Sequence, residues 1–387
     1  MRVCISPRMA AETELLASSN LRAGAPAVVT QSSQNELLVR AVPLAECGQA
    51  QARTPENAVR HSLMSCSLFL ALILLTPFTS ARDTVVSPLL IRNTSPAALL
   101  FAAPVMRSSA DSLTLSVDRG NIFSGDLSDN SLAAFDGETM LTNMSYNQTF
   151  ADVWSWGVDI PWVSHDGGFL DSFIDGFHDG LGFGSGGRDL VRRDRLVYTV
   201  QVDGQTVVDL RRSEKDIGDV RFYLGRSLLD SSNRSLALRG LVKLPTGNVD
   251  SLSGSEAVDA GAWLEYGQVD VFGLSRLSMT AMIGGMYLGK GELLPELQRD
   301  FMPVGHLGFG YQVHDRVQLL MQADAQGAPF DVDLSLLGRT GLQGTLGGRV
   351  FFKPSLWLDL GLVEDLYSNS SPDVIFHLSL HGRLGAD

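Results

Sequence analysis

One segment of this chain concentrates residue types that could bind a ligand. Residues 161–193 read P-W-V-S-H-D-G-G-F-L-D-S-F-I-D-G-F-H-D-G-L-G-F-G-S-G-G-R-D-L-V-R-R. A helix over 169–181 would put three Phe and one Leu, spaced four apart, on one face. Its other face would gather the polar candidates Asp171, Asp175, His178 and Asp179. The last three could bind a metal or polar ligand, but their spacing matches no recognised metal motif, so no metal site is predicted.

Serine and histidine lie close together at two places, which raises the question of nucleophilic catalysis. Ser164 precedes His165, and Ser379 lies just before His381. Neither pair has an acidic third member fixed by spacing, and no nucleophile-elbow signature surrounds either serine. The run G-F-G-S-G-G-R lacks the Gly-Lys-Ser/Thr ending of a phosphate-binding loop. We therefore predict a protein that is not an enzyme and that needs no cofactor.

The elements that position these residues follow from the alternation of apolar and polar side chains. Residues 374–384 read V-I-F-H-L-S-L-H-G-R-L, in which His377, His381 and Arg383 share one face and apolar side chains fill the other. A period of two with charge on one face only predicts a strand between lipid and a polar lumen. The pattern recurs, clearly or weakly, in residues 112–118, 138–147, 153–160, 218–229, 234–244, 259–266, 270–288, 302–313, 317–325, 342–352 and 355–366.

These segments predict an all-β fold, a transmembrane antiparallel barrel of about twelve strands, since single-chain bacterial barrels have an even number. The predicted connections alternate in length along the chain. The short ones are 147–152, 230–233, 267–270, 313–316 and 352–355; the long ones are 119–137, 161–217, 245–256, 289–301, 327–339 and 367–372. Outer-membrane barrels have short periplasmic turns and longer external loops. The helix at 169–181 would then cap the barrel mouth or lie at the bilayer interface, which we favour over a ligand site.

The competing fold is a soluble β-sandwich, which also alternates apolar and polar residues. Its polar faces would meet water, so they should be richer in Lys and Glu than these strands are. Alternating loop lengths are not expected of a sandwich either. Both observations favour the barrel.

The parity of the strands predicts which charged side chains line the lumen. Both signs occur among the candidates, so the interior could be a closed, paired network or a narrow pore. The candidates are Asp159, Arg239, Lys243, Asp259, Glu265, Asp324, Arg349, Asp359, His377 and Arg383.

Composition and the N-terminal third set the domain boundaries. The formal charge of -13 makes nucleic acid an unsuitable partner. All cysteines (Cys4, Cys47 and Cys66) precede residue 70. An apolar run over 63–75 followed by T-S-A predicts a signal peptide at 59–81, which makes residues 1–58 a mis-annotated or disordered extension. Residues 82–111 would be a periplasmic or lumen-packed segment, and we favour a packed one because A-A-L-L-F-A-A-P-V is apolar; residues 112–387 would form the barrel.

Three stretches carry a resemblance to known proteins. Residues 160–189, together with P-L-L-I-R-N-T-S-P at 88–96 and L-V-K-L-P-T-G at 241–247, resemble an uncharacterised domain-of-unknown-function family of proteobacterial outer-membrane proteins. The last stretch is also similar to barrels grouped with aromatic-hydrocarbon-degradation outer-membrane proteins. The resemblance implies an outer-membrane barrel and carries over no catalytic residues. One departure is the ending R-L-G-A-D, where such barrels usually end on an aromatic residue.

We therefore expect passive or gated uptake of a small molecule across the outer membrane of a Gram-negative bacterium. The alternatives are a structural or interaction barrel with a closed lumen and an outer-membrane hydrolase. Expected partners are outer-membrane lipid and lipopolysaccharide, the barrel-assembly machinery and a small-molecule substrate.

Overall fold

The computed structural model of the chain describes residues 87–101, 103–107, 110–128, 130–181, 191–367 and 370–385. The predicted extension (1–58), the predicted signal peptide (59–81) and the three cysteines lie outside the described residues.

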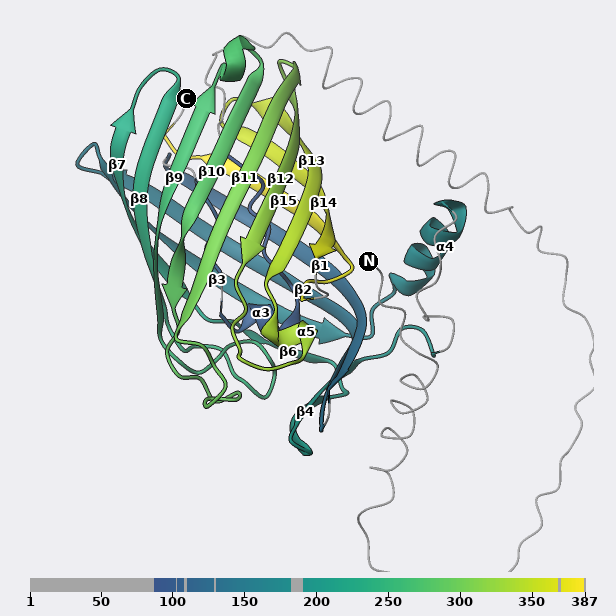
Figure 1. Cartoon of the computed structure of the whole chain (residues 1–387). Helices are drawn as coiled ribbons and strands as arrows, with labels where there is room; N and C mark the ends of the chain where they lie inside the picture. Colours follow the sequence, from purple (N-terminus) through teal and green to yellow (C-terminus); the bar gives the residue numbers. More distant parts are fainter. Residues whose placement is uncertain are drawn as a thin grey trace, which may run out of the picture. The chain divides into compact units, whose positions relative to one another are not determined.

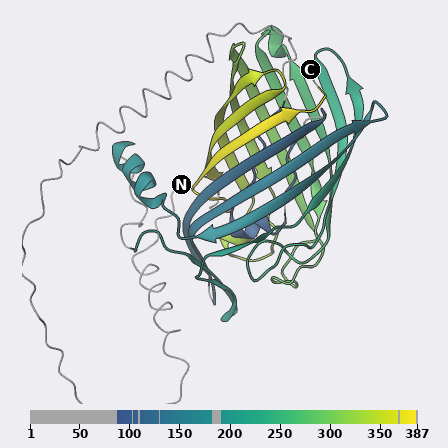
Figure 2. The same cartoon turned by 180° about the vertical axis from the view of Figure 1, so that it is seen from behind.

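Twelve antiparallel strands close into one ring (Figures 1 and 2), in which the first strand pairs with the last. The predicted barrel is confirmed and the sandwich is excluded, because the ring has no free edge. In their order around the ring, the strands are β1 (Ser112–Ser128), β2 (Ser131–Phe150), β3 (Trp154–Asp166), β7 (Arg221–Asp230), β8 (Arg234–Lys243), β9 (Asp259–Val269), β10 (Leu277–Tyr287), β11 (Phe301–His314), β12 (Val317–Gln326), β13 (Gly341–Lys353), β14 (Leu356–Tyr367) and β15 (Val374–Arg383).

The remaining elements lie in the connections or inside the ring. A hairpin extends the sheet beside β2, and a short strand does so beside β3. In chain order, these remaining elements are α3 (Pro96–Leu99), α4 (Asp171–Leu181), β4 (Val197–Val202), β5 (Gln205–Leu210), β6 (Glu214–Ile217), η2 (Val271–Gly273) and α5 (Ser335–Gly338). The hairpin is β4–β5, and the short strand is β6. The helix predicted at 169–181 is confirmed as α4. Among the described residues, no helix is long and apolar enough to cross a membrane.

The connections divide between the two ends of the barrel. Tight turns such as 231–233, 315–316 and 354–355 lie at one end, here called the short-turn end; the other end, with connections such as 244–258 and 327–340, is the long-loop end. The predicted long loop at 119–137 is wrong. These glycine-rich residues continue β1 and β2, which stay paired as far as Ser128 and Ser131. The pairing of β1 with β2 satisfies much of the backbone that the sequence pattern alone assigned to a loop. On the outer edges, β15 pairs with β1 as far as Asn121, and β4 pairs with residues 132–136 of β2.

The outer face of the ring is apolar and is bordered by aromatic side chains. Leu346, in the middle of β13, is 65% exposed, and Ile283 on β10 is 72% exposed. Soluble proteins rarely expose so continuous an apolar surface. Exposed aromatic residues gather towards both ends: Trp162, Tyr287, Phe301 and Tyr367 towards the long-loop end, and Phe150, Trp156, Phe272 and Tyr311 towards the short-turn end. An apolar band between two aromatic girdles is the exterior of a transmembrane barrel.

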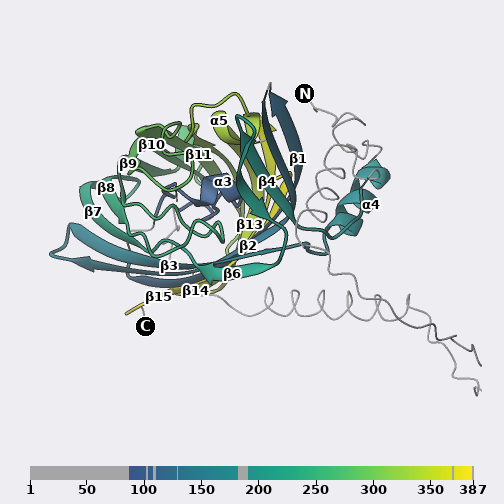
Figure 3. The ribbon, with the colours of Figure 1, turned by 90° about the horizontal axis from the view of Figure 1, so that it is seen from below.

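The lumen is occupied by the described residues of 87–110 (87–101, 103–107 and 110), here called the lumen segment. Seen from below in Figure 3, α3 lies inside the ring. Near the long-loop end, Phe101 packs edge-on against Phe330 at 5.4 Å between ring centroids, in the largest apolar core of the barrel. Both ends of the segment reach the short-turn half: Ser87 contacts Arg349, and the carbonyl of Ala110 accepts a hydrogen bond from Asn147. A ring of twelve strands encloses more space than its own side chains fill, and this segment fills it.

Candidate functional site: the polar network of the lumen

Asp159 on β3 is the centre of the network. Its side chain is fully buried. One carboxylate oxygen accepts hydrogen bonds from Arg107 (2.7 Å) and Ser145 (2.7 Å), and the other from Arg92 (2.5 Å) and Tyr223 (2.8 Å). Both arginines belong to the lumen segment. Arg92 lies in the arm that leads to α3, here called the ascending arm, and Arg107 lies in the arm that leads back to the short-turn half, the returning arm. A single carboxylate of the barrel wall therefore holds both arms.

The two arginines are charged in this environment. Burial by itself would lower the pKa of the Arg92 guanidinium, but Tyr223 and Asp159 beside it raise that pKa above its ordinary value. The same balance between burial and Asp159 raises the pKa of Arg107. Buried charges persist only when they are paired and hydrogen-bonded, and here the pairing crosses from the segment to the wall.

A second wall pair holds the returning arm. Arg239 on β8 donates to Glu265 on β9 at 2.6 Å and to the carbonyl of Arg107 at 3.2 Å. Glu265 in turn accepts the backbone N–H of Arg107 at 3.0 Å and the indole N–H of Trp263 at 2.8 Å. Among the described strands, none pairs with the backbone of Arg107. Side chains of the barrel wall therefore form the hydrogen bonds to its N–H and carbonyl groups.

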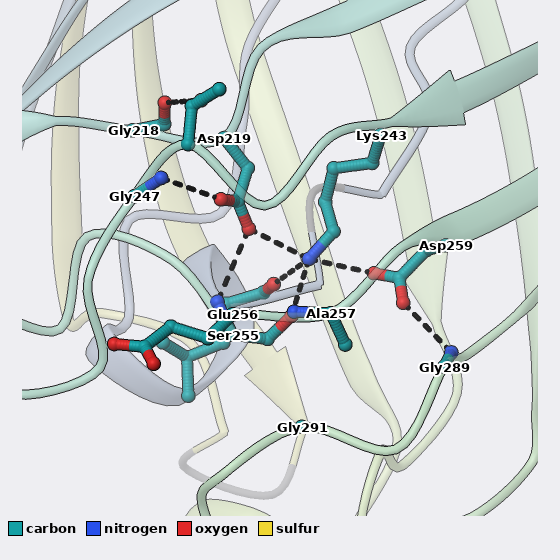
Figure 4. A network of polar contacts seen from close by, with 12 residues as sticks. Gly218, Asp219, Lys243, Gly247, Ser255, Glu256, Ala257, Asp259, Gly289 and Gly291 are labelled. Atoms are coloured by element: carbon teal, nitrogen blue, oxygen red, sulfur yellow. Dashed lines mark hydrogen bonds and ion pairs between the residues drawn. The ribbon is translucent and has the colours of Figure 1, made fainter.

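Lys243 ties the segment to the long loops (Figure 4). Its ammonium group, fully buried, donates to Asp219 (2.7 Å) and to the carbonyl of Leu100 (2.9 Å), and forms an ion pair with Asp259 (2.9 Å). Asp219 also accepts the backbone N–H groups of Gly247 and Ser255, and Asp259 accepts that of Gly289. One cation thus organises two long connections and the turn that follows α3.

The short-turn half contains a further cluster. Arg349 and Asp359, on neighbouring strands, form a bidentate pair at 2.7 and 2.8 Å. Arg349 also donates to Ser87 and to the carbonyl of Pro88, which fixes the start of the lumen segment. His381 lies 3.1 Å from the same carboxylate. A cavity of about 580 Å³ lies at this end of the barrel and is lined by Arg107, Arg239 and Arg383 among others.

On β15, a histidine and a serine lie close to an acidic side chain of β1. Their spacing in the sequence did not predict this contact. His377 Nδ1 is 2.5 Å from Asp118 on β1, and its Nε2 is 3.0 Å from Ser379 Oγ. His381 Nε2 approaches the same hydroxyl at 2.8 Å. Ser379 is only 1% exposed, in the lumen rather than at the lipid-facing rim.

The predicted lumen residues all lie on strands of the ring. Eight of the ten are buried, and Asp324 and Arg383 are partly exposed. The structure brings them together in pairs: Arg239 with Glu265, Lys243 with Asp259, and Arg349 with Asp359. Asp324 pairs with His306. Whether they line a transport path stays a prediction.

The predicted loop site is only partly described. Asp171 accepts a hydrogen bond from Asn121, and Asp175 pairs with Arg193 at 2.7 Å. The side chains of His178 and Asp179 lie outside the described residues. Helix α4 packs on the outer wall: Phe173 meets Phe376 at 5.8 Å between ring centroids, and Leu170 and Ile174 pack near Val374.

Sequence parity missed the residues of the lumen segment. Arg92 and Arg107 lie in an apolar stretch, where an arginine needs a buried acidic partner. That requirement is a signal that could have pointed to Asp159. Glu138 was also missed: it is fully buried and accepts the N–H groups of Phe169 and Leu170 ahead of α4.

Comparison with solved structures finds proteins of low sequence identity to this chain. The COG4313 outer membrane channel from Pseudomonas putida F1 is 10% identical, with a TM-score of 0.49, over 72% of this chain and 96% of that one. A Pseudomonas aeruginosa FadL homologue is 12% identical, with a TM-score of 0.35, over 80% and 99%. The Pseudomonas putida toluene transporter TodX is 12% identical, with a TM-score of 0.34, over 74% and 91%. No curated protein matches the chain.

The resemblance to an uncharacterised family, drawn from three stretches of sequence, is confirmed over the whole barrel. A family model described as "Protein of unknown function (DUF3187)" matches residues 64–384, and the chain belongs to that family.

Proposed function

We propose that this protein is a gated channel for a small molecule in the outer membrane of a Gram-negative bacterium, and that the lumen segment is its gate. The observation that carries the proposal is the way in which the lumen is filled. The barrel wall does not close the lumen by itself; a separate stretch of chain does so, held at its middle by hydrogen bonds and ion pairs to Asp159 and Glu265. Such contacts can exchange for water or ligand.

The gate moves by a local shift and not by expulsion. Phe101 and the residues around it are packed in the apolar core under the long loops, and pulling them out would expose much apolar surface. Exchanging the polar contacts of Arg92 and Arg107 for water or an anion exposes no comparable apolar surface, and it leaves their guanidinium groups with acceptors. The long loops face outwards and the short turns face the periplasm, with lipid, lipopolysaccharide and the barrel-assembly machinery as partners.

Conductance in planar bilayers tests the proposal. The wild-type barrel should be mostly closed with brief openings, and Asp159→Asn should open more often, since it removes the anchor of both arms. A wild type and a variant that are equally silent, with no binding of small molecules, would instead indicate a structural barrel with a closed lumen.

A second candidate function, hydrolysis, rests on one observation. Asp118, His377 and Ser379 have the hydrogen-bond order of a catalytic triad. Against it, Ser379 is buried and shares its hydroxyl with His381. Labelling by a fluorophosphonate that Ser379→Ala abolishes would support a hydrolase; an unlabelled wild type would exclude this nucleophile.

A further inference from the structure

Arg221, the first residue of β7, is a buried cation without a full partner. Its side chain is 3% exposed, and its Nη1 lies 3.7 Å from Asp159, beyond hydrogen-bond length. A carboxylate offers about four acceptor positions. Those of Asp159 already accept from Arg92, Arg107, Tyr223 and Ser145. Within the described part of the chain, neither Nε nor Nη1 of Arg221 has a hydrogen-bond partner.

Arg221 lines a small cavity. This cavity measures about 40 Å³ and lies between the lumen segment and the wall, lined by Arg221, Arg92 and Gln343 among others. Gln343 is 6% exposed, and its Nε2, a second donor, is also without a partner among the described residues. Two buried, unpartnered donors on one cavity indicate a ligand that accepts hydrogen bonds.

An acidic group on the same cavity, Asp324, has one hydrogen-bond partner on each oxygen. Asp324 accepts from His306 Nδ1 at 2.7 Å and from Gln322 at 2.9 Å, one contact on each oxygen. Asn93, also in the lining, donates to Ser370 and Ser371. Among the described residues that line the cavity, the buried side-chain atoms without a hydrogen-bond partner belong to Arg221 and Gln343, and all of them are donors. Asp118, a further acid near Arg92, is paired with His377 through Oδ1, and its Oδ2 has no hydrogen-bond partner among the described residues; it is not part of the cavity lining.

We propose that this cavity is a binding site for a small anion, such as a carboxylate group, held by Arg221 and Gln343 with Arg92 at its edge. The volume exceeds the ~10–15 Å³ that one water needs and suits a group the size of formate. Since the site lies on the lumen segment, it also assigns the substrate class of the channel, small organic anions; that assignment rests on the function proposed above.

The anion site is coupled to the gate through Arg92. This guanidinium contacts Asp159 and also lines the cavity. A carboxylate in the cavity competes with Asp159 for Arg92, because both are acceptors of the same charge and shape. Binding therefore loosens the ascending arm of the segment.

Binding of formate to the full-length barrel in detergent tests the site without any need for conduction. The readout is the midpoint temperature at which the barrel changes mobility on a gel, in sodium formate and in sodium gluconate, a bulkier anion, at equal ionic strength. Formate should raise the midpoint of the wild type in a saturable way. Arg221→Gln should weaken the apparent affinity about tenfold or more. Arg276→Gln, an exposed arginine outside the lumen, should behave as wild type.

Three outcomes would overturn the site: equal midpoints of the wild type in both salts, a formate effect unchanged in Arg221→Gln, or a similar loss in Arg276→Gln. If Arg221→Gln does not assemble, Arg221→Lys and Gln343→Leu replace it with the same expectation.

A failure of the proposed channel function can be told apart from a failure of the anion site. If the formate effect is present but wild type and Asp159→Asn never conduct, the anion site stands and the assignment of a transported substrate is wrong. If they conduct, potassium chloride gradients should show chloride preference, reduced in Arg221→Gln; cation preference would overturn the substrate class.

Discussion

Arg92 of the lumen segment and Asp159 of the barrel wall lie 2.5 Å apart, with both side chains buried. They are 67 residues apart in sequence. This contact, with that of Arg107 to the other oxygen of the same carboxylate, makes the state of the lumen depend on one acidic side chain.

Asp159→Asn should destabilise the barrel by about 3–5 kcal/mol, because it leaves buried arginines without their counter-ion. Urea-induced unfolding in detergent measures the loss. The matched control is Asp300→Asn, an exposed acid paired with Lys290, which should change stability by less than about 1 kcal/mol. Equal losses in the two variants would contradict the role given to Asp159.

Lys243→Met should loosen the long-loop end. Without the ammonium group, the buried carboxylates of Asp219 and Asp259 lose their shared cation, at a cost of about 3–5 kcal/mol. Limited proteolysis should then cut residues 244–258 faster than in wild type. Lys290→Met, which removes an exposed lysine, should leave the cleavage rate unchanged; acceleration in both would point to a general effect of lost charge.

Leu346→Arg tests the lipid-facing surface. Leu346 is 65% exposed in the middle of β13, so an arginine there should cost about 2–4 kcal/mol in a bilayer. Folding into lipid vesicles at varied urea concentration measures the difference. Lys353→Arg, at the end of the same strand, should be nearly neutral. A neutral Leu346→Arg would mean that this face does not contact lipid.

Helix α4 should lie at the bilayer interface. A nitroxide attached through Phe173→Cys should be more accessible to oxygen than to a polar nickel reagent, because this side chain packs on the outward-facing Phe376. All native cysteines precede residue 70, so the barrel itself adds no competing thiol. Ser172→Cys, also exposed on the helix, is the control and should favour the polar reagent. The reverse order would place Phe173 in water.

The ring was predictable because a strand between lipid and a polar interior repeats every two residues. Predicted segments such as 317–325 and 342–352 lie within β12 and β13. Residues 119–137 were mispredicted as a loop because glycine and aspartate are frequent in turns, whereas here β1 and β2 pair with each other through this region as far as Ser128 and Ser131.

The candidate site was only half predictable. Parity identifies the wall residue Asp159 but not its partners, because Arg92 and Arg107 belong to a segment without regular alternation. Nor does it pair His377 with Asp118, since that contact joins residues 259 positions apart through closure of the ring. Contacts that depend on closure have no local signature in the sequence.

The most direct test of the gate is a reversible crosslink between the lumen segment and the wall. Thr94 Oγ1 lies against the position that a Cβ at Gly120 would take, so Thr94→Cys with Gly120→Cys should form a disulfide after a small adjustment. Single-channel conductance of this pair in the Asp159→Asn background is then recorded before and after reduction. We predict a closed barrel when oxidised and frequent openings once reduced. Equal conductance in the two states would contradict the account.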